Sequence, residues 1–212
     1  MVKFERFGGA SGVIAVAAIA LQFLIAGTAP PEIQSLIHNR MRWEWTTMLR
    51  IVGSLGIIWF TAGLAARLRR LGSRPASAAS VVLGAGILWG TVWLLSALFN
   101  SAAISMSAVG DPAGVGLLAV LGADSVLTLT PALSVAFLAA TGAAVLASPT
   151  FPRRYGYMTL CSAGFRLVLA IVDWYGSASL AMRIMDLTLL WVVVTAFHLL
   201  GATRPAAPAT EA

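Results

Sequence analysis

Long apolar stretches, each about 20 residues and nearly free of charge, constrain the fold of this chain more than any other feature. Six of them occur, at residues 10–29, 46–66, 78–99, 124–147, 156–176 and 180–201. A helix rises about 1.5 Å per residue, so about 20 residues cross the roughly 30 Å hydrocarbon core of a bilayer. The sequence therefore predicts an all-α fold, a polytopic bundle of six transmembrane helices.

The composition agrees with a lipid environment. Apolar residues make up 59% of the 212 residues and charged residues 10%, where soluble domains have about 45–50% and about 25%. So few charges cannot cover the surface of a soluble protein of this length. This excludes a soluble enzyme, a disordered chain and the usual kind of nucleic-acid binder, and it makes the lipid bilayer the first expected partner.

The fourth stretch belongs to an apolar run, 113–147, that is too long for one plain span. Its 35 residues would extend about 50 Å as a helix. Gly122 and Asp124 interrupt the run, so we expect a short interfacial or re-entrant piece at 113–121 and a span at 124–147. Pro131 removes a backbone hydrogen bond and is expected to kink that span. Two spans joined by a hairpin within the run are an alternative.

The basic residues indicate the orientation of the chain. With six spans, nine Lys and Arg residues fall on one side and four on the other. The larger group comprises Lys3, Arg6, Arg67, Arg69, Arg70, Arg74, Arg153, Arg154 and Arg204. The smaller group comprises Arg40, Arg42, Arg50 and Arg183. Cytoplasmic loops carry the excess of Lys and Arg, so both termini are predicted to lie in the cytoplasm.

The ends of the chain carry no further domain in this interpretation. The first stretch follows basic residues as a signal peptide does, but its apolar core is longer and Pro30 disfavours cleavage, so an uncleaved helix is expected. The tail 202–212 is rich in Pro and Ala and is expected to be disordered. Cys161 is the single cysteine, which excludes an intrachain disulfide. With only His38 and His198 beside that thiol, we predict no metal site and no cofactor.

Ionisable residues inside the predicted spans mark the candidate site, because a charge within the bilayer is costly. Six lie in the outer half or at the middle: Arg50, Asp124, Arg166, Asp173, Arg183 and Asp186. Helical spacing puts Arg166 with Asp173, and Arg183 with Asp186, on shared faces. Four charges from the last two spans can therefore meet in one interhelical space. That space is either a polar cavity open to the outer side or an ion-pair network that locks the helices.

Aromatic side chains accompany these charges deep in the spans. Trp59, Trp89, Trp93 and Trp191 either pack helices together or line a pocket, where an indole face attracts positive charge. Asn100, at the outer end of the third stretch, adds hydrogen-bonding groups. The candidate ligand-binding residues are therefore Arg50, Arg166, Arg183, Trp59, Trp89, Trp93 and Asn100.

Two segments carry a resemblance to a known family. They are TTMLRIVGSLGIIWFTAGLAARLRR in the second span and ADSVLTLTPALSVAFLAATGAAVLASPTFPRRYGYMTLCSAGF across the fourth and fifth. They resemble a group of uncharacterised bacterial six-helix membrane proteins with a domain of unknown function. The resemblance implies six helices in a bacterial inner membrane, with Arg50 and Asp124 as family features, and it implies no activity.

The chain also resembles small integral membrane terpene cyclases, in its intramembrane carboxylic acids and many aromatic residues. That resemblance implies a hydrophobic isoprenoid substrate, with Glu44, Asp124, Asp173 or Asp186 as the proton donor. A carboxylic acid kept neutral by desolvation can protonate an alkene or epoxide, and aromatic faces stabilise the carbocation. Arg166, by contrast, would tend to keep nearby acids ionised.

Three functions therefore stay open at the level of the sequence. The first is a protein that binds or moves a small or lipid-like molecule through an outer-half polar cavity. The second is a membrane enzyme acting on an isoprenoid. The third is a structural subunit whose ion pairs hold its helices together. The sequence does not fix the oligomeric state.

Overall fold

The computed structural model describes residues 2–26, 39–148, 151–175 and 188–198, with the backbone alone at residues 2, 74, 123–128 and 173–175. All regular structure in these ranges is α-helical, which confirms the all-α prediction. The labelled helices are α1 (Val2–Ala26), α3 (Arg40–Arg69), α4 (Ser73–Val109), α5 (Pro112–Leu146) and α6 (Arg153–Tyr175). A further helical segment covers Thr188–His198.

Five stretches of the described helices are long and apolar enough to cross a membrane. They are Lys3–Ala26, Arg40–Arg69, Pro75–Val109, Leu129–Leu146 and Arg153–Val172. This is compatible with a multi-pass integral membrane protein. Of the predicted sixth span, 180–201, the described part is the helix Thr188–His198, and the tail 202–212 lies outside the described residues.

Helix α4 extends beyond the predicted span 78–99 and continues to Val109. Residues 100–109 contain neither Gly nor Pro, so nothing in them ends the helix. The helix stops where Gly110 adopts the left-handed conformation, with φ of 79°, which a side chain would disfavour. Span prediction from hydropathy measures compatibility with lipid and does not detect where a helix ends.

Helix α5 is continuous, so the separate interfacial piece predicted at 113–121 is not present. The helix begins with two strong N-terminal signals. The carboxylate of Asp111 accepts a hydrogen bond from the Gly114 amide at 3.1 Å, and Pro112 follows directly. Pro131 lies inside the helix. The helix continues through Gly122 and Pro131 and ends at Leu146.

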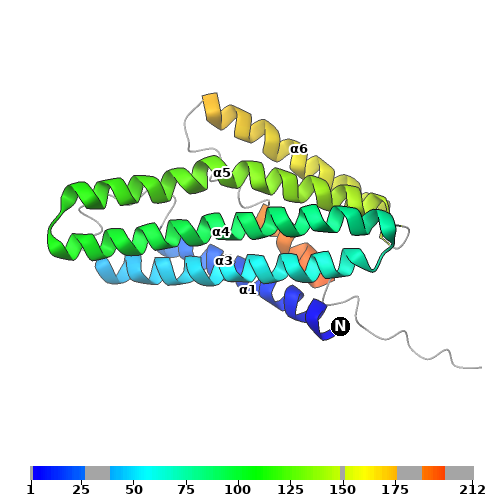
Figure 1. The fold of residues 1–212 in the computed structure, drawn as a ribbon, viewed down its shortest axis with the longest axis horizontal. Coiled ribbons are helices and arrows are strands. Elements are labelled where there is room, and N and C mark those ends of the chain that lie inside the picture. Colours follow the sequence, from blue (N-terminus) through cyan, green and yellow to red (C-terminus); the bar gives the residue numbers. More distant parts are fainter. Residues whose placement is uncertain (1, 27–38, 149–150, 176–187, 199–212) are drawn as a thin grey trace, which may run out of the picture.

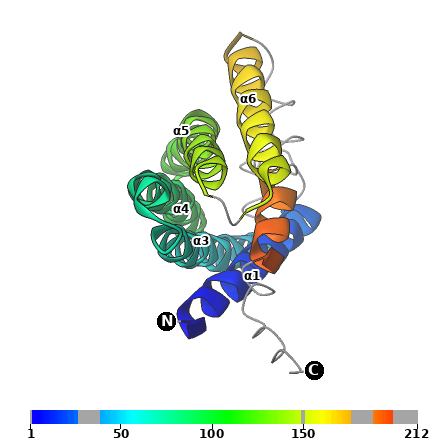
Figure 2. The same ribbon diagram turned by 90° about the vertical axis from the view of Figure 1, so that its right-hand side faces the viewer.

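The helices pack mainly against their neighbours in the chain. Figure 1 shows α3, α4 and α5 side by side as long rods, with α1 crossing α3. The end view in Figure 2 shows α6 leaning away from the other helices at one end. The segment Thr188–His198, drawn in orange, lies against α1 and α6. It contacts α1 near Gly12 and is hydrogen-bonded to α6 through Trp191.

Small residues bring the helix backbones into close approach. A Cβ added at Gly63 in α3 would lie 2.7 Å from the Cα of Gly8 in α1. A Cβ at Gly86 in α4 would lie 2.2 Å from the Thr61 side chain. Between α5 and α6, a Cβ at Gly142 would lie 2.8 Å from Leu160. Close packing through small residues is how membrane helices associate where lipid removes the hydrophobic force between them.

The core is a column of aromatic side chains, Phe60, Trp89, Phe137, Trp191 and Tyr155, which we call the aromatic column. Phe137 is its centre, with ring centroids 5.9 Å from Trp89 and 5.6 Å from Trp191. Tyr155 stacks on Trp191 at 6.3 Å with an interplanar angle of 17°. The column joins α3, α4, α5, α6 and the segment Thr188–His198, and these side chains fill the middle of the bundle.

Two tryptophans of the column differ in hydrogen bonding, and this predicts different costs of substitution. The indole N–H of Trp191 donates to the Thr159 hydroxyl at 2.9 Å, whereas the buried N–H of Trp89 has no partner among the described residues. We expect Trp191→Phe to lower the free energy of unfolding in detergent by about 1–2 kcal/mol more than Trp89→Phe, since only the former loses a buried hydrogen bond. Equal losses in the two variants would contradict this assignment.

Candidate functional site

Arg50 in α3 lies at the centre of a polar cluster formed by four helices. Its Nη1 donates to the Ser96 hydroxyl in α4 at 2.7 Å. In the orientation that satisfies both ends of its amide, Gln22 in α1 accepts from Arg50 Nε at 3.3 Å and from Nη2 at 3.0 Å. The guanidinium carbon also lies 5.9 Å from the centroid of the Trp93 ring. With Gly122 of α5, these residues make up what we call the Arg50 cluster.

Gly122 links α5 to the cluster. The Ser96 hydroxyl, which accepts from Arg50, donates to the Gly122 carbonyl at 2.8 Å. A Cβ added at Gly122 would lie 3.1 Å from the Asn100 side-chain oxygen, so glycine allows α4 and α5 to approach here. Ser96, Asn100 and Gln22 are all buried. The cluster is therefore a built polar site inside apolar helices.

The charge of Arg50 is not balanced by a described neighbour. An arginine side chain stays protonated at neutral pH, and its partners here are a hydroxyl, an amide and an aromatic face. Among the side chains that the structure describes, no carboxylate forms an ion pair with Arg50. Arg50 itself is only partly buried, although Gln22 and Ser96 beside it are buried. The described partners of the guanidinium are therefore all neutral, at Ser96, Gln22 and the Trp93 ring.

Three of the predicted ligand-binding residues, Arg50, Trp93 and Asn100, come together in or beside this cluster. Trp89 lies one helical turn before Trp93 and belongs to the aromatic column. Trp59 is placed differently: it is 46% exposed and meets Phe7 edge-on, with ring centroids 5.4 Å apart. The structure thus does not bring Trp59 to Arg50.

Glu44 does not have the environment that a neutral acid needs. Its side chain is 49% exposed and accepts from Arg40 Nε at 2.7 Å, one turn earlier in α3. A carboxylic acid is kept protonated by burial away from cations, and both conditions fail here. The structure therefore gives no support to Glu44 as the proton donor of an isoprenoid-converting enzyme.

Arg166 in α6 is buried at a separate point. Its Nε donates to the Ser134 hydroxyl in α5 at 3.3 Å. Ser134 follows Gly122 by 12 residues in α5, which is roughly 18 Å along a helix. Arg50 and Arg166 thus engage α5 at two distant levels and do not line one cavity together.

The remaining charged candidates cannot be assigned partners. The helices α5 and α6 contain Asp124 and Asp173, but the side chains of both lie outside the described part of the structure. Arg183 and Asp186 lie outside the described residues entirely. The predicted meeting of four charges between the last two spans therefore stays a prediction.

Sequence reasoning missed a buried ion pair at the other end of α3. The Glu5 carboxylate in α1 is 2% exposed, and lies 3.1 Å from Arg70 Nη1 and 3.5 Å from Arg67 Nη1. The signal was present: α1 and α3 pack antiparallel, so the start of one lies beside the end of the other. Glu5 is the lone acid near the basic start of the chain, opposite the arginine run that closes α3.

Within the described residues, no three His, Cys, Asp or Glu side chains gather as the ligands of a metal ion. Comparison with protein-family models, with curated proteins and with solved structures finds no match. The function is therefore inferred from the geometry of the chain itself.

Proposed function

We propose that this protein is a six-span integral membrane protein of the bacterial inner membrane that binds or moves a small or lipid-like molecule. Both termini lie in the cytoplasm in this proposal, and Arg50 receives an acidic group of the ligand in the outer half of the bundle. The resemblance to bacterial six-helix membrane proteins, in which Arg50 and Asp124 carry over, belongs to the same proposal.

One observation carries the proposal: the charge of Arg50 meets only neutral described partners within a helix apolar enough to span a membrane. A cation held in a medium of low dielectric constant gains from an opposite charge far more than it would in water. A purely structural arginine would be expected to pair with a carboxylate of its own bundle. A charge that has only neutral partners among the described residues therefore favours a ligand with an acidic group.

The surroundings favour a ligand that is also apolar. Leu21 beside Gln22 in α1 and Met48 in the preceding turn of α3 are exposed, at 46% and 59%. Apolar side chains are thus exposed on both of the helices that carry Gln22 and Arg50. A long-chain carboxylate combines these two properties, and it is the simplest probe.

The test compares Arg50→Gln with Arg42→Gln. Arg42 is an exposed arginine eight residues earlier in α3 whose Nε donates to the Ile25 carbonyl, so it is a matched control outside the cluster. We expect Arg50→Gln to weaken oleate binding to the detergent-solubilised protein by at least about tenfold, as loss of a charge-assisted hydrogen bond predicts. Arg42→Gln should change the dissociation constant less than about twofold. Native mass spectrometry or equilibrium dialysis measures both.

The other outcomes identify the competing functions. If Arg50→Gln lowers only the melting temperature and binding is unchanged, Arg50 is a structural residue and the proposal fails. Ser96→Ala removes one neutral partner of Arg50 and keeps the charge, so it should retain oleate binding. This variant is measured if Arg50→Gln does not fold. An isoprenoid-converting enzyme would instead lose product formation in Asp173→Asn and Asp186→Asn while keeping its thermal stability.

A further inference from the structure

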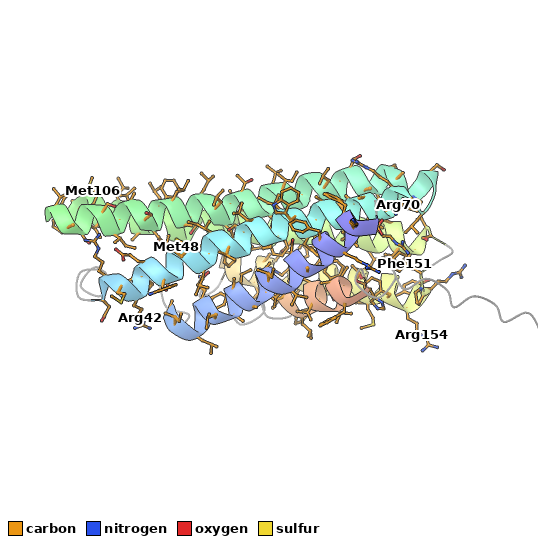
Figure 3. The ribbon with its side chains drawn as sticks, turned by 90° about the horizontal axis from the view of Figure 1, so that it is seen from below. Arg42, Met48, Arg70, Met106, Phe151 and Arg154 are labelled. Atoms are coloured by element: carbon orange, nitrogen blue, oxygen red, sulfur yellow. The ribbon has the colours of Figure 1, made fainter. Side chains whose placement is uncertain are left out.

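Exposed arginines gather at the end of the bundle where α3 finishes and α6 begins. Figure 3 shows Arg70, Phe151 and Arg154 together at this end, with Arg42 and Met106 at the opposite one. Arg69 and Arg153 are also exposed there, each adjoining one of these arginines in sequence. Glu5 is the only carboxylate that the described residues place here, and it is already ion-paired. This end therefore carries a net positive charge.

A small cavity lies beneath these arginines, between α3, α5, α6 and the segment Thr188–His198. Its volume is about 10 Å³, which is room for one atom of the size of a water oxygen. Its polar lining comes from Arg67, Thr141, Tyr155, Thr195 and His198, and Phe151 and Val145 are among its apolar residues. Because His198 is exposed and Arg67 is partly exposed, the cavity lies at the surface of the bundle.

The polar groups of the cavity leave one donor without an acceptor. The Tyr155 and Thr195 hydroxyls are hydrogen-bonded to each other, and Thr195 donates to the Trp191 carbonyl at 2.8 Å, so both are satisfied. Arg67 is not satisfied: Nη1 meets Glu5 at the long distance of 3.5 Å, and the buried Nε has no partner among the described residues. A buried donor without an acceptor is costly, so an acceptor oxygen beside Arg67 would stabilise the protein.

We propose that this pocket binds the phosphate of an anionic phospholipid headgroup. One phosphate oxygen occupies the cavity and accepts from Arg67. Arginine suits this role because its planar fork of donors matches phosphate geometry. Basic pockets between membrane helices are suited to such headgroups. The site is separate from the Arg50 cluster and does not depend on the function proposed for it.

The test uses the full chain in detergent, with dioleoylphosphatidylglycerol as the probe and dioleoylphosphatidylcholine as the neutral lipid. We expect the wild type to bind the anionic lipid at least about tenfold more tightly than the neutral one. Arg67→Gln should remove most of that preference. Arg69→Gln is the matched control, because it removes an exposed charge from the same helical turn without touching the cavity. It should change the affinity less than about twofold.

A second variant keeps the proposal testable if Arg67→Gln does not fold, since Arg67 also faces Glu5. Val145→Ile fills the cavity with one added carbon and leaves every charge in place, so it too should weaken binding of the anionic lipid. Equal loss in Arg67→Gln and Arg69→Gln, or unchanged binding in Val145→Ile, would mean that only diffuse charge attracts the lipid, and would overturn the proposal. Displacement of the lipid by an equal concentration of inorganic phosphate would also overturn the proposal, because the ligand would then be free phosphate.

Discussion

Replacing Gly63 with valine is expected to separate α1 from α3 and to remove most of the stability of the bundle. The Cα of Gly8 would lie 2.7 Å from the new Cβ, and a backbone atom cannot rotate away as a side chain can. Overpacking a core costs about 1–3 kcal/mol where side chains can yield. Here two backbones must part, so we expect a loss above about 3 kcal/mol.

Thermal unfolding of the purified protein in detergent, with size-exclusion chromatography to detect aggregation, measures this effect. Gly84→Val is the matched control, since Gly84 is also a helical glycine but has open space around its position, with nothing within 4 Å of an added Cβ. It should melt within a few degrees of the wild type. If Gly63→Val and Gly84→Val have the same melting temperature, α1 and α3 do not approach each other as closely as described here.

Replacing Glu5 with glutamine is expected to produce the second large loss of stability. Removing one partner of a buried ion pair costs about 3–5 kcal/mol, because the remaining charge stays desolvated. The side chains of Arg67 and Arg70 are 27% and 31% exposed and can recover some hydration, so we expect about 2–3 kcal/mol here. The melting temperature in detergent reports the difference.

Glu44→Gln provides the comparison. Glu44 also pairs with an arginine, at 2.7 Å, but both side chains are about half exposed, at 49% and 58%. A solvent-exposed pair one helical turn apart contributes about 0.3–0.5 kcal/mol. Similar losses for the two glutamates would show that burial does not distinguish these pairs, and that Glu5 is not enclosed between α1 and α3.

The helical fold could be predicted from the sequence because lipid imposes a length and a polarity on each span. The ends of the helices could not be predicted in the same way. Hydropathy falls after residue 99, but helix geometry continues until Gly110 permits a left-handed turn. In α5 the reverse holds: Gly122 suggests a break, whereas in the structure it provides space for Asn100 of the neighbouring helix. Close approach between helices is a tertiary property that one stretch of sequence does not reveal.

The sequence could predict the charged residue of the Arg50 cluster and some of the residues around it. Arg50 stands out because charges are rare in the spans, and Trp93 and Asn100 share a helix face because they are seven residues apart. Trp59 follows Arg50 by nine residues, about half a turn from its face, and is accordingly on the other side of α3. Gln22 and Ser96 could not be singled out, since neutral polar residues are common in helices and only the packing shows which ones meet.

The hairpin of α4 and α5 is longer than a membrane is thick. Its helices of 37 and 35 residues extend about 55 Å and 52 Å, against a hydrocarbon core of about 30 Å. Tilting alone would require more than about 50°, beyond the usual range of about 0–40°. Helices of this length reach beyond a hydrocarbon core, and Val109 and the turn at Gly110 lie at one end of the hairpin. The accessibility of a tag inserted at that turn, measured from each side of the membrane, would show the orientation of the whole chain.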